Sequence, residues 1–184
     1  MTCIVSKNIR IRYPEVFKVG DYSIVDDFCY FSSAVYVGRC AHIASGCSVA
    51  GGRNESFILG DYCSLSSGVK VWCASDDFVN DLVTIIPSFV KQKVKENFIT
   101  GGVKIHNYCA IGSNTVIMPN NQIPEGVSIG ALSFVPANFK FEPWSVYAGS
   151  PIRLIKKRNQ ESVIKQANKL ELALSRKPGQ SAGD

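Results

Sequence analysis

The chain has 184 residues, of which 46% are hydrophobic and 19% charged, and it carries a formal net charge of +5. This composition excludes a disordered chain, and the length suits a single domain over residues 1–184. No apolar run approaches the roughly 20 residues of a membrane helix, and residues 1–19 do not read as a signal peptide. We therefore expect a cytoplasmic protein without membrane insertion.

A six-residue period runs through most of the chain. Steps of six residues, with two interruptions, meet a large apolar side chain sixteen times, although Val, Ile, Leu and Phe make up only 54 of the 184 residues. Self-similarity at a fixed period is typical of solenoid folds. The positions are Val19, Val25, Phe31, Val37, Ile43, Val49, Leu59, Leu65, Val71, Ile99, Ile105, Ile111, Ile117, Ile123, Ile129 and Val135.

The position four residues further on is small in thirteen of the sixteen units, with exceptions at Arg53, Asn121 and Phe139. Four of the seven cysteines occupy it, and the odd count and the lack of a CxxC pair argue against a disulfide framework or a zinc site. We interpret these cysteines as small buried groups. They are Cys29, Cys47, Cys63 and Cys109.

An aliphatic first position and a small fifth position predict a triangular parallel β-helix, in which each unit forms one short strand and one corner. Three units make a coil of 18 residues, and coils stack at about 4.8 Å, the ordinary spacing of strands. Sixteen units over residues 19–139 give a little over five coils. The fold class expected is an all-β solenoid.

Two segments interrupt the repeat. Residues 51–58 form a short bulge, and residues 77–98 form a loop too long for a mere connection, so we expect it to be functional. The apolar side chains of this loop need an apolar partner, for which a neighbouring subunit is a natural choice. They are Ile85, Ile86, Pro87 and Phe89.

The last segment, residues 140–184, is expected to cap the β-helix. It contains nine basic and four acidic residues, against eleven of each in residues 1–139, so the whole charge excess lies here. A basic tail suits a phosphorylated ligand, and nucleic acid is disfavoured because the basic residues are not interleaved with aromatic ones. The apolar spacing predicts a helix from Gln160 to Ser175.

The repeat resembles that of the left-handed parallel β-helix acyltransferases with hexapeptide repeats, over roughly Val19 to Arg158. The segment Tyr147 to Arg158, YAGSPIRLIKKR, is similar to the closing segment of the galactoside and maltose acetyltransferases. The resemblance implies a homotrimer with active sites between subunits, acetyl-CoA as the acyl donor and a sugar as the acceptor. It also suggests a place in surface polysaccharide synthesis, such as lipopolysaccharide O-antigen.

The resemblance also implies residues that bind coenzyme A. Arg153 and Lys156, helped by Lys157, would contact its phosphates, for which Arg offers two donors and Lys a point charge. Ser113 and Ala131 are matched candidates for contacts with the pantetheine arm.

The general base is the least clear part of the site. The sugar acetyltransferases carry a His at the start of the long loop, where this chain has Asp76, followed by Asp77. His42 lies in a run that resembles the nucleotide-sugar N-acetyltransferases, whose separate basic His would fall at Ser33. Our hypothesis is that His42 of one subunit is oriented by Asp76 or Asp77 of the next.

Alternatives to O-acetylation remain open. An amine needs less help with its proton, so N-acetylation of a nucleotide-linked amino sugar is the second interpretation, and a non-catalytic trimeric platform is the third. Two histidines are too few for a zinc-dependent member of the fold, so no metal is expected. His106 is read as structural, and Asp26 and Asp27 as solvated wall residues.

Overall fold

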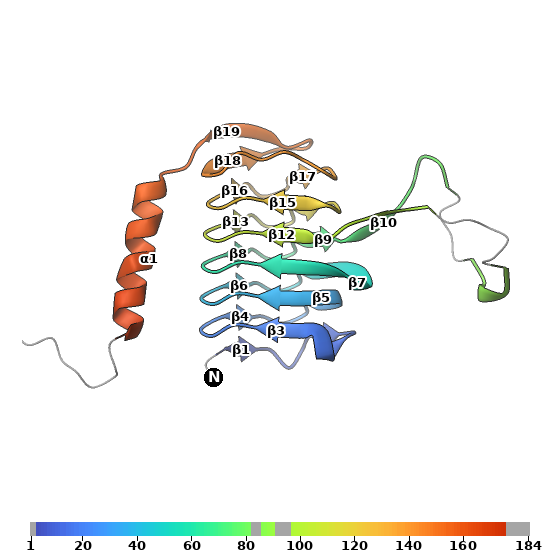
Figure 1. Ribbon diagram of the computed structural model, residues 1–184, viewed down its shortest axis with the longest axis horizontal. Coiled ribbons are helices and arrows are strands. Elements are labelled where there is room, and N and C mark those ends of the chain that lie inside the picture. The colour runs from blue at the N-terminus through green and yellow to red at the C-terminus, as the bar shows by residue number, and fades with distance from the viewer. Residues whose placement is uncertain (1–2, 82–85, 91–96, 176–184) are drawn as a thin grey trace, which may run out of the picture.

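The computed structural model describes residues 3–81, 86–90 and 97–175, which form a stack of coils with one helix beside it (Figure 1). One strand from each coil forms a first face, on which neighbouring strands are parallel. In order, these strands are β1 (Ile4–Val5), β4 (Ile24–Val25), β6 (His42–Ile43), β8 (Ser64–Leu65), β13 (Ala110–Ile111), β16 (Ser128–Ile129) and β18 (Ser145–Ala148).

The other two faces share one sheet, because β5 (Tyr30–Val37) and β7 (Ser48–Leu59) are long enough to continue round the corner between them. The second face adds β2 (Arg10–Ile11), β9 (Lys70–Trp72), β14 (Val116–Ile117) and β17 (Phe134–Val135). The third adds β3 (Phe17–Val19), β12 (Val103–Ile105) and β15 (Asn121–Ile123), and the short helix η1 (Pro14–Val16) precedes β3. The predicted bulge at residues 51–58 lies within β7, opposite register shifts in β5.

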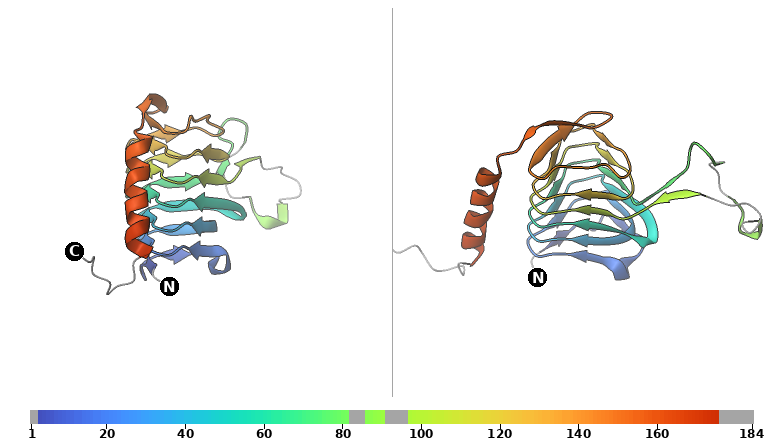
Figure 2. Two further views of the ribbon diagram at one scale, coloured as in Figure 1. Left: turned by 60° about the vertical axis from the view of Figure 1, so that its left-hand side comes forward. Right: turned by 45° about the horizontal axis from the view of Figure 1, so that its top comes forward.

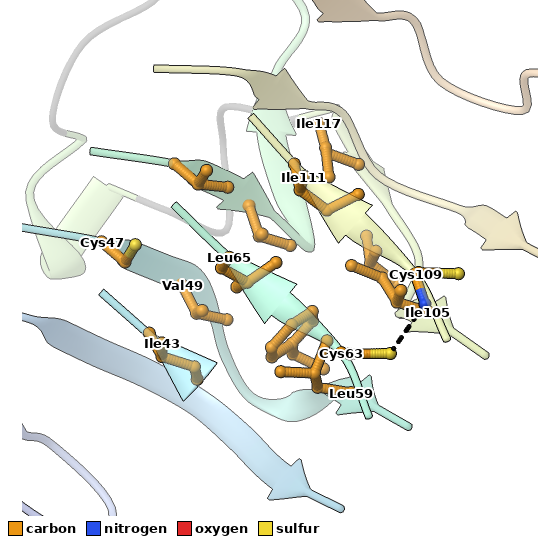
Figure 3. Packing of buried hydrophobic residues seen from close by; sticks show 14 of the residues in the cluster. Ile43, Cys47, Val49, Leu59, Cys63, Leu65, Ile105, Cys109, Ile111 and Ile117 are labelled. Atoms are coloured by element: carbon orange, nitrogen blue, oxygen red, sulfur yellow. Dashed lines mark hydrogen bonds between the residues drawn. The ribbon is translucent and has the colours of Figure 1, made fainter. Parts of the chain in front are cut away.

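The first position of the repeat fills the interior of the prism, as predicted. Ile43, Leu65 and Ile111 stand in register on successive coils and are fully buried (Figure 3). The small residues of the fifth position are buried beside them, except Ser75, which lies in the stem of the long hairpin. Asn121, an exception to the small rule, is also fully buried, and its amide donates to the carbonyl oxygens of Met118 (2.8 Å) and Pro136 (2.9 Å).

The cysteines confirm their interpretation as small interior groups. Five are buried and all seven are free thiols. The Cys63 thiol donates to the carbonyl of His106 (3.0 Å), and its sulfur accepts the backbone N–H of Cys109 at 3.3 Å (Figure 3). Burial raises the pKa of Cys73 to about 11.

The stack is taller than the repeat predicts. It begins at Ile4 and not at Val19, and Tyr147, buried in register above Ile129, extends it at the other end. The seven strands of the first face therefore mark seven coils. Strand β19 (Arg153–Lys157) then pairs antiparallel with β18 and closes the top.

The long loop leaves the stack as a hairpin. Its stem is β10 (Ala74–Asp76) paired antiparallel with β11 (Phe98–Thr100), and the short helix η2 (Ser88–Val90) lies within the loop. Ile99 was expected in the interior, but it pairs with Ser75 in the stem and is 40% exposed, because the hairpin residues bond to each other and not to the coils. Ile85 lies outside the described residues.

The helix α1 (Gln160–Ser175) has the predicted bounds. It stands beside the stack on the side away from the hairpin (Figure 2), and among the described residues of the helix Ala167 is the buried one. An ion pair between Arg39 and Glu171 ties it to the third coil. No helix within the described ranges is both long and apolar enough to cross a bilayer.

Candidate active site

The outer surface of the first face carries a strip of small side chains, which we call the outer strip. Above His42, the outward residues in register are small on three successive coils. The residues two positions further along each coil are small as well. A Cβ on Gly112 would lie 2.3 Å from the backbone nitrogen of Ala131, so no larger residue fits there. The outer strip consists of Ser64, Ser66, Ala110, Gly112, Ser128, Gly130 and Ala148.

Two of the predicted phosphate-binding residues stand at the top of the outer strip. Arg153 pairs with Ala148 and Lys156 with Val146, and directly opposite residues of an antiparallel pair share a face. Both are exposed, and among the described residues neither has an ion-pair partner.

Lys157 is placed differently from its neighbours in β19. Its ammonium donates to Glu142 (2.6 Å) and to the hydroxyl of Ser145 (3.1 Å). A charge already paired with a carboxylate binds phosphate less well. The structure therefore favours Arg153 and Lys156 over Lys157 as anion ligands.

Ser113 and Ala131 lie along one edge of the outer strip. They follow Gly112 and Gly130 on neighbouring coils, and the carbonyl of Ser113 accepts the N–H of Leu132 at 2.9 Å. The structure thus brings these two residues next to the strip at mid-height. Their predicted contact with a pantetheine arm stays a prediction.

His42 marks the lower end of the outer strip, and its carboxylate partner lies in the same chain. Its Nε2 is 2.8 Å from Oδ2 of Asp26, one coil below, and the two side chains are 45% and 42% exposed. Asp26, expected to be a solvated wall residue, is partly exposed on the outer wall, and it also contacts His42. The repeat did not point to this pair, because the residue in register beneath His42 is Ile24 and not Asp26.

A cavity of about 420 Å³ opens beside this pair. Asp26 lines it together with Asp27, whose carboxylate accepts hydrogen bonds from Ser6 and from the amide of Asn8. The remaining lining residues include Ile4, Phe28 and Ser45. The surface below His42 is thus acidic and hollowed, whereas the surface above it is small and neutral.

Asp76 and Asp77 lie at the base of the hairpin, away from the first face, and within one chain they do not meet His42. Asp77 uses its carboxylate on its own turn: it accepts the amide of Asn80 (2.7 Å) and the backbone N–H groups of Val79 and Asn80. These hydrogen bonds, the Asn80 amide first, lower the pKa of Asp77. Asp76 is exposed, and no hydrogen bond to its carboxylate occurs among the described residues.

Ser33 occupies the position of the second histidine in the nucleotide-sugar enzymes. It is buried, and within the described ranges its hydroxyl is the one buried side-chain polar atom without a hydrogen-bond partner. It therefore faces no outer surface from which it could reach a substrate. Across the same ranges, no group of three or more His, Cys, Asp or Glu side chains gathers as a metal site would.

The chain is similar in sequence and in structure to known acyltransferases. No family model matches the sequence. The dTDP-4-amino-4,6-dideoxy-D-glucose acyltransferase of Escherichia coli is 27% identical over 177 residues, 88% of each chain. A hexapeptide-repeat acetyltransferase of Vibrio cholerae, 19% identical with a TM-score of 0.62 over 79% of this chain and 77% of its own, shares the fold.

The solved structure of AntD, an N-acyltransferase from Bacillus cereus, is 32% identical with a TM-score of 0.83, over 94% of this chain and 89% of its own. It was crystallised with dTDP and 3-hydroxybutyryl-CoA, and one of its variants with dTDP-4-amino-4,6-dideoxyglucose and coenzyme A. These matches confirm the expected left-handed β-helix with a C-terminal helix. The chain is an acyltransferase and belongs to the hexapeptide-repeat acyltransferase family.

Proposed function

We propose that this chain transfers an acyl group from an acyl-coenzyme A to the amino group of a nucleotide-linked amino sugar. The observation that carries the proposal is the near full-length similarity to AntD, an N-acyltransferase crystallised with such a sugar nucleotide. The E. coli relative bears the name of the same reaction class. The proposal therefore follows our second interpretation, transfer to the amine of a nucleotide-linked amino sugar, and not our first one, O-acetylation. A cytoplasmic location and a part in O-antigen synthesis stay predictions.

The outer strip suits the pantetheine arm of the donor. From His42 to Val146 the strip climbs four coil steps, which is about 19 Å at the usual strand spacing. An extended pantetheine arm is of similar length, about 15–20 Å by ordinary bond lengths. With its phosphates on Arg153 and Lys156, its thioester would reach the level of His42.

Asp76 is the candidate for contact with the acceptor amine. AntD was also crystallised with a serine or an aspartate replaced, and those two residues lie ten positions apart in its sequence. Ser66 and Asp76 are ten positions apart here, as are Ser67 and Asp77. The first pair fits better, because Ser66 lies on the outer strip whereas the carboxylate of Asp77 caps its own turn.

These placements suit the predicted homotrimer with sites between subunits. The outer strip and Asp76 belong to different sides of one prism, so a shared site requires the hairpin of one subunit to approach the strip of another. The hairpin loop carries exposed apolar side chains that suit such a contact, namely Phe78, Val79 and Phe89. Light scattering coupled to gel filtration should therefore give three times the mass of the 20.1 kDa chain.

Thiol release from acetyl-CoA and 3-hydroxybutyryl-CoA tests the function. The acceptors are dTDP-4-amino-4,6-dideoxyglucose and its 4-hydroxy counterpart, with products identified by mass spectrometry. We expect an amide from the amino sugar and no turnover of the hydroxyl sugar. Ester formation on the hydroxyl sugar would restore O-acylation. No turnover and no thermal stabilisation by coenzyme A would favour the non-catalytic platform.

A further inference from the structure

The contact between His42 and Asp26 fixes which ring nitrogen can take part in chemistry. A carboxylate accepts hydrogen bonds and donates none, so the 2.8 Å contact places a proton on Nε2 of His42. In the neutral ring, Nδ1 then carries the lone pair. His42 held in this way offers a hydrogen-bond acceptor to a bound molecule and not a donor.

Among the residues that the structure describes, Asp26 is the one carboxylate in contact with His42. On the coil above, the residue in register with His42 is the uncharged Ser64. On the coil below, the residue in register is Ile24, followed closely by Asp26. The adjacent carboxylate, Asp27, faces the first coil and bonds to Ser6.

We propose that Asp26 is a positioning residue that holds His42 with Nδ1 as the proton acceptor of acyl transfer. This rests on the proposed function and adds a residue that the sequence did not indicate. Both side chains are about half exposed, so a ligand on the outer strip can reach the ring while the pair stays intact. His42 lies between the outer strip above and the acidic cavity below. It is therefore placed next to the thioester of a donor that binds along the strip.

The transfer step balances without a further reactant. The free amine attacks the thioester carbon, a C–N bond forms and the C–S bond breaks. The nitrogen loses one proton to Nδ1 of His42, and the departing thiolate takes up that proton, so the imidazole returns to its neutral form. Asp26 stays ionised throughout and stabilises the transient imidazolium, as the buried carboxylate does in a hydrolase triad.

The test compares Asp26→Asn with Asp27→Asn, which removes the same charge one residue away. Long-range proton–nitrogen NMR correlation distinguishes the protonated from the bare ring nitrogen, and His42→Gln identifies the signals, because the chain has two histidines. We expect Nε2 protonated in the wild type and in Asp27→Asn, and a mixed or reversed tautomer in Asp26→Asn. We also expect Asp26→Asn to lower kcat about 10- to 100-fold with KM for the acyl-CoA little changed.

An unchanged tautomer in Asp26→Asn, or an equal loss of kcat in Asp27→Asn, would overturn the proposal. If Asp26→Asn does not fold, Asp26→Glu is the second variant. It retains a carboxylate, so Nε2 of His42 should stay protonated, and a changed tautomer would contradict the proposal. The NMR result does not depend on turnover. A wild-type protein that shows the tautomer but acylates no amino sugar would therefore refute the proposed function separately.

Discussion

Asp76 and Asp77 are adjacent in the chain, yet only Asp77 binds its own turn. Its carboxylate accepts the amide of Asn80 and two backbone N–H groups, whereas Asp76 ends the strand β10 with an exposed side chain. Two residues that the sequence could not separate thus have different surroundings. One is a turn cap, and the other is available to a ligand.

Asp76→Asn should therefore abolish most activity, while Asp77→Asn should not. Loss of a carboxylate that contacts the attacking amine should reduce kcat/KM for the amino sugar on the order of 100-fold or more. Asp77→Asn is the matched control and should change kcat/KM less than about 5-fold, because it alters a turn and not the contact. Steady-state kinetics at saturating acyl-CoA measures both. A larger loss in Asp77→Asn would reverse the assignment.

The interior of the fold was predictable because a β-helix repeats one packing environment. Within the coils the first position fills the prism, so the spacing alone located side chains such as Ile43 and Ile117, both fully buried, and it failed at Ile99, which the hairpin removes from the stack. The ends were not predictable by the same route. Tyr147 stands one coil, 18 residues, above Ile129, but it follows units in which the small fifth position is lost, at Phe139.

The site was predictable only in part, because its contacts join residues on different coils. The basic segment was visible as a motif, but its division into available charges and a paired Lys157 depends on Glu142, fifteen residues earlier. Likewise, Asp26 reaches His42 through the stacking of two coils. Such pairs depend on how side chains on neighbouring coils lie next to each other. The six-residue repeat predicts which positions are buried but not these contacts.

Arg153 and Lys156 should set the affinity for the donor. A charge-assisted hydrogen bond contributes about 1.5–3 kcal/mol, so Arg153→Ala or Lys156→Ala should raise KM for the acyl-CoA about 10-fold or more and leave KM for the amino sugar unchanged. Lys157→Ala is the control and should raise KM for the acyl-CoA less, because the Lys157 ammonium is already paired with Glu142. The salt dependence of KM for the acyl-CoA gives a second readout, because added salt screens contacts between exposed charges. Equal effects of all three variants would contradict the assignment.

The cysteines should differ in reactivity according to burial. The pKa of Cys73 is raised to about 11, chiefly by burial, so at pH 8 only about one such thiol in a thousand is ionised. Cys3 and Cys40 are only half-buried. We expect a thiol reagent to modify at most these two in the native protein and all seven in denaturant, as counted by mass spectrometry. Rapid modification of Cys73 in the native protein would show that its coil opens readily.

Gly112→Ala should damage both the stack and the outer strip. The added Cβ would lie 2.3 Å from the nitrogen of Ala131 and 2.7 Å from the carbonyl carbon of Gly130, and backbone atoms cannot move aside cheaply. Overpacking of this kind costs about 1–3 kcal/mol in the free energy of unfolding. Gly130→Ala is the matched control one coil higher, because its closest contact is the Cβ of Ala148 at 3.0 Å. Denaturant unfolding should therefore rank wild type above Gly130→Ala and Gly130→Ala above Gly112→Ala, and the reverse order would show that the coils can separate at Gly112.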